Sequence, residues 1–200
     1  MSSGTPRKAR VERETRETRV AVEVCLDGGG GCAVDTGIGM LDHMLEQIAR
    51  HGLFDLEVSA SGDLDRDEHH LVEDVGLCLG AAFDEALGDR AGLVRMGHAV
   101  VPMDETLVLA ALDLSGRGYA TADLKFERDR VGQLPTELVS HFLESFARTA
   151  RMTLHVRELA GGNDHHRMEA AFKALARALG TAVRRDARAG QDVPSTKGSL

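Results

Sequence analysis

Two short segments of this chain nearly copy one another. Each has two adjacent histidines and a glutamate four residues after the first. The copies are His69-His70 with Glu73 and His165-His166 with Glu169. If both segments are helical, the first histidine and the glutamate lie one turn apart on the same face. The second histidine then lies about 100° around the helix, because one turn takes ~3.6 residues. The two histidines of each pair can therefore bind two different metal ions, as a two-metal site requires.

The similarity between the two halves extends upstream of the histidine pairs. A segment with one histidine comes first, at His43 and at His141, and a short apolar segment follows before each pair. Self-similarity at about half the chain length indicates two equivalent units rather than a solenoid. We expect a first half at 9–93, a second half at 94–187 and a tail at 188–200, with the two halves forming one compact unit.

Hydrophobic periodicity predicts the same order of elements in each half. The expected elements are strands within 9–26, 32–35 and 53–61 with helices at 39–51 and 68–87, then strands at 97–102, 106–114, 119–126 and 152–158 with helices at 135–151 and 163–185. Gly52 is expected to stop the first helix, Pro135 to lie in the first turn of the third, and Asn163 or Asp164 to cap the fourth. The fold class is α+β, with an internally duplicated unit of three strands, helix, strand, helix and two sheets that carry their helices on one face.

Composition excludes several classes of protein. The net charge of -8 argues against a general nucleic-acid binder, and no apolar run reaches the ~18 residues of a membrane span. The hydrophobic content of 42% is enough for a core. Three widely spaced cysteines, Cys25, Cys32 and Cys78, are typical of reduced thiols. We expect a cytoplasmic protein without membrane or nucleic-acid partners.

The duplicated histidines indicate metal ligands. His51, His98 and His155 lack a duplicated context and are interpreted as structural or surface residues. Imidazole with carboxylate and without thiolate suits manganese, iron, nickel or zinc rather than calcium. Helical geometry and pseudo-twofold symmetry divide the ligands into two sets. One set is His69, Glu73, His141 and His166, and the other is His43, His70, His165 and Glu169. Four protein ligands on an octahedral ion leave about two positions for water or substrate, which favours catalysis.

Two alternatives share these ligands. One is a structural two-metal site or a metal-driven assembly without chemistry, and the other is a metal storage or sensing module. Neither explains cationic residues at distant turns and in the tail, namely Arg95, Arg117 and Lys197. Together Ser195, Thr196 and Lys197 offer hydroxyls, a cation and accessible backbone, which suggests phosphate binding. The charged run 12–19 is interpreted, from its residues alone, as a solvated strand or turn.

Several motifs together resemble the imidazoleglycerol-phosphate dehydratase family. They are Leu41-Asp42-His43-Met44-Leu45, Asp67-Glu68-His69-His70 with Glu73-Asp74, Ser140-His141-Phe142, Asp164-His165-His166 with Glu169 and Phe172-Lys173, and Pro194-Ser195-Thr196-Lys197-Gly198. The resemblance covers about 9–198, and no ligand position departs from the family pattern.

The resemblance implies a hydro-lyase of histidine biosynthesis. Such an enzyme removes water from D-erythro-imidazole glycerol phosphate to give imidazole acetol phosphate, with two Mn²⁺ ions per active site. It implies a ribosomal protein S5 domain 2-like fold and a homo-oligomeric shell of 24 subunits with sites between subunits. It implies phosphate binding by Arg95, Arg117, Ser195 and Lys197, and substrate contact by Glu17. That last role replaces the interpretation of 12–19 as a solvated segment.

The implied reaction is difficult because the proton to be lost is not next to a carbonyl group. Our hypothesis is that two metal ions on the ring nitrogens favour the imidazolate, which expels the C3 hydroxyl before a base takes the C2 proton. Glu17 is the candidate acid/base, although a metal-bound water or hydroxide can do the same work. Glu73 and Glu169 belong to the catalytic centre through the metal ions.

Overall fold

The computed structural model describes residues 5–190, 192–198 and 200 of the chain. The first half contains β1 (Lys8–Glu14), β2 (Thr18–Cys25), β3 (Cys32–Asp35), α1 (Gly39–Gly52), β4 (Asp55–Gly62) and α2 (His69–Leu87). The second half contains β5 (Met96–Met103), β6 (Thr106–Asp113), β7 (Tyr119–Asp123), β8 (Arg130–Val131), β9 (Leu134–Pro135), α3 (Glu137–Thr149), β10 (Thr153–Ala160) and α4 (Asp164–Ala182). The predicted α+β class and the order of elements in each half are confirmed.

The two halves have the same sheet topology. One four-stranded sheet has the order β1-β2-β4-β3, and the other has the order β5-β6-β10-β7. In each, the first three strands pair antiparallel and the last strand pairs parallel. An additional short hairpin, β8–β9, precedes α3 in the second half only and was not predicted.

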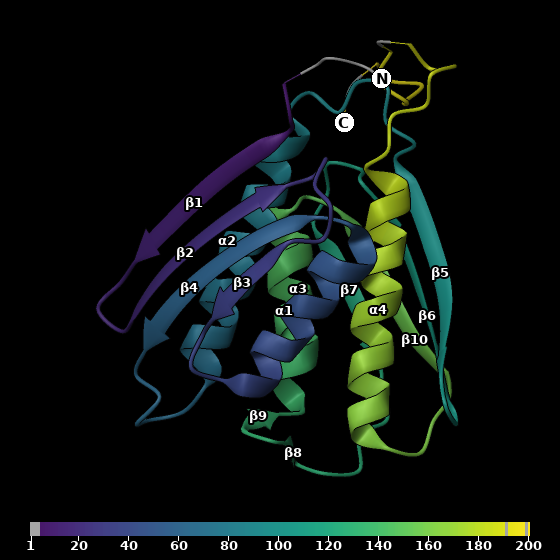
Figure 1. Ribbon diagram of the computed structural model, residues 1–200. Helices are drawn as coiled ribbons and strands as arrows, with labels where there is room; N and C mark the ends of the chain where they lie inside the picture. Colours follow the sequence, from purple (N-terminus) through teal and green to yellow (C-terminus); the bar gives the residue numbers. More distant parts are fainter. Residues whose placement is uncertain (1–4, 191, 199) are drawn as a thin grey trace.

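The four helices lie between the two sheets, as Figure 1 shows. Each sheet directs one side of its strands at the helices, so that Val20, Val22 and Val24 of β2 are buried. The helices pack across the two halves, α1 against α4 and α2 against α3. Residues from both halves therefore share one hydrophobic core, and helices distant in sequence become neighbours.

A glycine allows α2 and α3 to approach closely. A β-carbon at Gly80 of α2 would lie 2.4 Å from the carbonyl oxygen of Phe146 in α3 and 2.1 Å from Oγ1 of Thr149. The hydroxyl of Thr149 donates a hydrogen bond of 2.8 Å to the carbonyl of Leu77 in α2. Backbone contact rather than side-chain interdigitation thus sets the spacing of these two helices.

Two predicted helix boundaries were wrong. Gly52 is the last residue of α1, and the left-handed residue that ends the helix is Leu53, with φ 60°. Gly52 serves a different purpose, because a β-carbon there would lie 2.3 Å from the ring of Phe54. Pro135 lies in β9 rather than in a helix, and α3 begins at Glu137. The predicted cap of α4 is confirmed at Asn163, whose side chain accepts from the backbone N–H of His165.

Among the described residues, no helix is both long enough and apolar enough to cross a membrane.

Candidate metal centre

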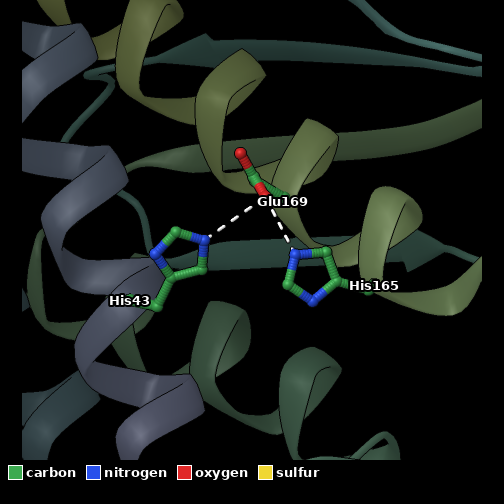
Figure 2. Close-up of side chains that lie close together, drawn as sticks. All are labelled: His43, His165 and Glu169. Atoms are coloured by element: carbon green, nitrogen blue, oxygen red, sulfur yellow. Dashed lines mark hydrogen bonds and ion pairs between the residues drawn. The ribbon is translucent and has the colours of Figure 1, made fainter.

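The contact between α1 and α4 creates the first candidate cluster. Nε2 of His43 lies 3.3 Å from Oε2 of Glu169, and Nε2 of His165 lies 3.1 Å from the same oxygen. Figure 2 shows both rings directed at the carboxylate from two different helices. The other oxygen of Glu169 lies 2.5 Å from Nζ of Lys173, one turn along α4. Two imidazole nitrogens and one carboxylate oxygen thus converge, as the helical spacing of His165 and Glu169 predicted.

The Glu169 carboxylate stays ionised despite its position. Burial acts to raise its pKa, but hydrogen bonds from Lys173 and His43 outweigh burial, so the pKa lies below its usual range. An anionic oxygen beside two imidazoles is the donor set that a divalent transition metal prefers.

The N-terminus of α4 is fixed by a buried network beside its histidines. The Asp164 carboxylate accepts from the backbone N–H groups of Glu127 and Arg128, and from Nη1 of Arg167 at 2.6 Å. Asp164 and Arg167 are both buried. The segment between β7 and β8 is thereby bonded to the helix turn that carries the histidine pair.

The contact between α2 and α3 creates the second candidate cluster. It contains His69, Glu73 and His141, with Nε2 of His141 3.8 Å from Oε1 of Glu73. The ring centroids of His69 and His141 are 4.5 Å apart. Nε2 of His141 is buried and has no hydrogen-bond partner in the described part of the chain. A buried polar atom without a partner is costly, and a metal ion would satisfy this nitrogen. The residues present therefore fit a divalent ion.

The second histidine of each pair does not join the expected set within one chain. His70 lies with Glu17 and Asp63, and His166 lies with Asp104 and Glu105. The physical reason is the expected rotation of about 100° around the helix, which directs these rings away from the neighbouring helix. Each cluster consequently contains three of its four predicted ligands.

The neighbours of His70 and His166 include carboxylates that sequence reasoning missed. A hydrogen bond with Asp63, reinforced by the charge of Glu17, raises the pKa of His70. The backbone N–H of Asn163 and a hydrogen bond from His166 lower the pKa of Glu105 to about 2. The sequence offered a partial signal, because both acidic residues lie in short polar turns between predicted elements.

The candidate phosphate-binding residues gather around the C-terminal tail. Nη1 of Arg95 donates to the carbonyl of Pro194 at 2.6 Å, while Nε and Nη2 bind Asp113 at 2.7 and 2.9 Å. The carbonyl of Ser195 accepts from the N–H of Gly198, so Thr196 and Lys197 lie in a turn. The tail is thus folded here, although its sequence has no periodicity.

Arg117 lies near the end of the same tail. A β-carbon at the preceding Gly116 would lie 2.5 Å from the carbonyl carbon of Leu200. Nη1 of Arg117 makes one long contact, 3.4 Å, with the carbonyl of Ser115.

Arg95 and the tail that it binds lie far from the cluster of His165 in the same chain. Arg95 bonds through its backbone to Ala182 at the C-terminal end of α4, whereas His165 lies in the first turn. A helix of 19 residues spans roughly 28 Å at about 1.5 Å per residue. Figure 1 shows the tail and the start of α4 at opposite ends of the molecule.

Comparison with known proteins agrees with these observations. The family model described as imidazoleglycerol-phosphate dehydratase matches residues 36–179. A protein of that name from Roseiflexus sp. (strain RS-1) is 58% identical over 97% of this chain and 98% of that protein. Another from Dehalococcoides mccartyi (strain ATCC BAA-2266 / KCTC 15142 / 195) is 56% identical over 98% of each.

Two solved structures share the fold. The imidazoleglycerol-phosphate dehydratase of Staphylococcus aureus subsp. aureus N315 has a TM-score of 0.81 and 35% identity, covering 90% of this chain and 99% of that chain. The enzyme from Pyrococcus furiosus, in complex with (S)-C348, has a TM-score of 0.82 and 37% identity, covering 95% and 100%. This chain therefore belongs to the imidazoleglycerol-phosphate dehydratase family of hydro-lyases.

Proposed function

We propose that this protein removes water from D-erythro-imidazole glycerol phosphate to give imidazole acetol phosphate, with two Mn²⁺ ions per active site. Family membership supports the reaction and its place in histidine biosynthesis. The two clusters support the number of ions, since each offers two imidazoles and one carboxylate without a thiolate. Three free cysteines support a cytoplasmic location.

The active site, in this proposal, is shared between chains. The observation that carries this is the incompleteness of each cluster in one chain, with His70 and His166 directed elsewhere. A neighbouring chain would supply His70 to the cluster of His43, and His166 to the cluster of His141. The distance between the clusters and the tail supports the same conclusion, because one small substrate cannot contact both in a single chain. We propose the shell of 24 subunits as the assembly that completes these sites.

Each group in the shared site has a distinct role. A divalent ion bound at each cluster would supply Lewis acidity that favours the imidazolate form of the substrate's ring. Glu17, whose carboxylate is partly exposed, transfers a proton at the glycerol carbons. The phosphate is held by the cations and hydroxyls of Arg95, Arg117, Ser195, Thr196 and Lys197. Binding energy from this remote group positions the reacting carbons.

The first test is a dehydration assay. Apo protein is reconstituted with Mn²⁺ and the ketone product is followed by absorbance. We expect turnover that depends on the metal. A correctly assembled protein with two bound ions per chain and no turnover would instead indicate a metal-organised shell without catalysis.

A further inference from the structure

The internal duplication places a glutamate beside each second histidine. Glu17 lies in the turn between β1 and β2 and directly precedes Thr18, the first residue of β2. Glu105 lies in the turn between β5 and β6 and directly precedes Thr106, the first residue of β6. Both threonines are buried. Glu17 and Glu105 therefore occupy equivalent positions in the two halves, although only Glu17 was singled out from the sequence.

The two glutamates have diverged in what they contact. Oε2 of Glu105 lies 3.0 Å from Nδ1 of His166, within hydrogen-bond distance. Oε2 of Glu17 lies 3.8 Å from Nδ1 of His70, beyond that distance, and Oδ2 of Asp63 binds this nitrogen at 3.2 Å instead. In the first half, an aspartate from the loop before α2 has taken the place that the duplicated glutamate holds in the second half.

The acceptor at Nδ1 determines which nitrogen can bind a metal. An ionised carboxylate only accepts hydrogen bonds, so Nδ1 of His70 and of His166 must carry the proton. In a neutral ring the lone pair is then on Nε2. Nε2 is also the nitrogen that His43 and His165 direct at Glu169. Metal-binding histidines generally donate their other N–H to a carboxylate or carbonyl in this way.

The two carboxylates that contact the histidines differ in their own surroundings. Glu105 accepts from the backbone N–H of Asn163 at 2.7 Å and from Oγ1 of Thr106 at 3.2 Å. The Asp63 side chain is restricted by burial alone, because its Oδ1 has no hydrogen-bond partner in the described part of the chain. The Glu17 carboxylate, by contrast, accepts no hydrogen bond within the stretches of chain that the structure describes, and remains free for another partner.

We propose that Glu105 and Asp63 are positioning residues that hold Nδ1–H of His166 and His70, so that Nε2 of each faces a metal ion of a neighbouring chain. Asp63 thereby releases Glu17, the counterpart of Glu105, for proton transfer to the substrate. This inference rests on the proposed function for the identity of the metal sites.

Metal affinity tests the proposal independently of turnover. Mn²⁺ binding to the assembled full-length protein is measured by calorimetry for Glu105→Ala and Asp63→Ala, with Glu12→Ala as a control at an exposed carboxylate of β1. We expect a 10–100-fold loss of affinity at one of the two sites for each test variant, and none for the control. Glu105→Gln and Asp63→Asn keep an oxygen that accepts from Nδ1–H, so we expect them to recover part of the affinity.

Double variants separate positioning from a general structural effect. In a His166→Ala background, Glu105→Ala should cause no further loss of Mn²⁺ affinity. In a His70→Ala background, Asp63→Ala should likewise cause no further loss. Glu17→Gln should keep wild-type Mn²⁺ affinity while kcat falls. Undiminished affinity in the alanine variants, or an equal loss in both backgrounds, would overturn the inference. If these paired substitutions show the expected coupling in Mn²⁺ affinity but the wild-type protein has no turnover, the dehydratase proposal is rejected and the inference still holds.

Discussion

The guanidinium of Arg95 donates a 2.6 Å hydrogen bond to the backbone carbonyl of Pro194. This contact joins the residue before β5 to a tail residue that follows it by 99 positions. It places Ser195, Thr196 and Lys197 beside Arg95, at the far end of α4 from His165. The tail is therefore part of the folded molecule.

Replacing Lys197 with alanine should weaken substrate binding. The substrate's phosphate would lose one charge-assisted hydrogen bond, worth about 1.5–3 kcal/mol, so kcat/KM should fall roughly 10–100-fold, mainly through KM. Steady-state kinetics checks this, with Lys125→Ala as the matched control at an exposed lysine outside the tail. An unchanged KM and efficiency would contradict a phosphate role for Lys197.

Replacing Glu17 with glutamine should lower kcat by about 10²–10⁴-fold, the usual contribution of a positioned acid or base. The substitution keeps size and polarity but removes the transferable proton site. Turnover and Mn²⁺ content are measured on the same samples. Near-normal turnover with intact metal would remove Glu17 from proton transfer and leave the role to a metal-bound water or hydroxide.

Two inactive variants should complement one another if sites form between chains. His141→Ala disrupts a metal cluster, whereas Arg117→Ala/Lys197→Ala disrupts the proposed phosphate binding. Random co-assembly after mixing unfolded chains gives about one quarter of sites with both parts intact, if one cluster pair and one tail form each site. Activity well above that of either variant alone is the expected result. Sites formed within single chains would give no such gain.

Replacing Gly80 with alanine should force α2 and α3 apart. The new methyl group would meet the carbonyl of Phe146 and the hydroxyl of Thr149, and overpacking of this kind costs about 1–3 kcal/mol. We expect a lower melting temperature. We also expect weaker metal binding at the cluster of His69 and His141, because this cluster lies between the same two helices. Gly29→Ala is the control, because nothing lies within 4 Å of a β-carbon there. Equal melting temperatures would show that the helices adjust without cost.

The buried thiol of Cys78 should react slowly with thiol reagents, and it should lower the stability of the folded protein at alkaline pH. Burial raises its pKa to about 11. The folded state therefore holds this proton more tightly than the unfolded state, and stability is lost as pH rises between about 9 and 11. Denaturant titrations should show a steeper alkaline loss for the wild type than for Cys78→Ala. At pH 8 a thiol reagent should modify exposed Cys32 well before Cys78. Parallel pH profiles for the two proteins would contradict this assignment.

The repeating order of elements and the residue types of the candidate metal clusters follow from the sequence alone, because both depend on short-range periodicity. The spacing of His165 and Glu169 requires a shared helix face, and the structure has them converging on one oxygen with His43. The sequence also placed the cap of α4 at Asn163 or Asp164, since capping is a local hydrogen bond. Local signals were weaker at Pro135, which suits a short strand as well as the first turn of a helix.

Which groups meet over long distances in the sequence depends on how the whole chain packs. Nothing local pairs α1 with α4 or α2 with α3, and these pairings depend on how two sheets enclose four helices. The same packing leaves His70 and His166 outside the clusters of their own chain and brings Asp63 and Glu105 to their Nδ1 atoms. Side-chain partners of this kind depend on the relative placement of separate elements, and that placement is set by burial of the whole core rather than by any one segment.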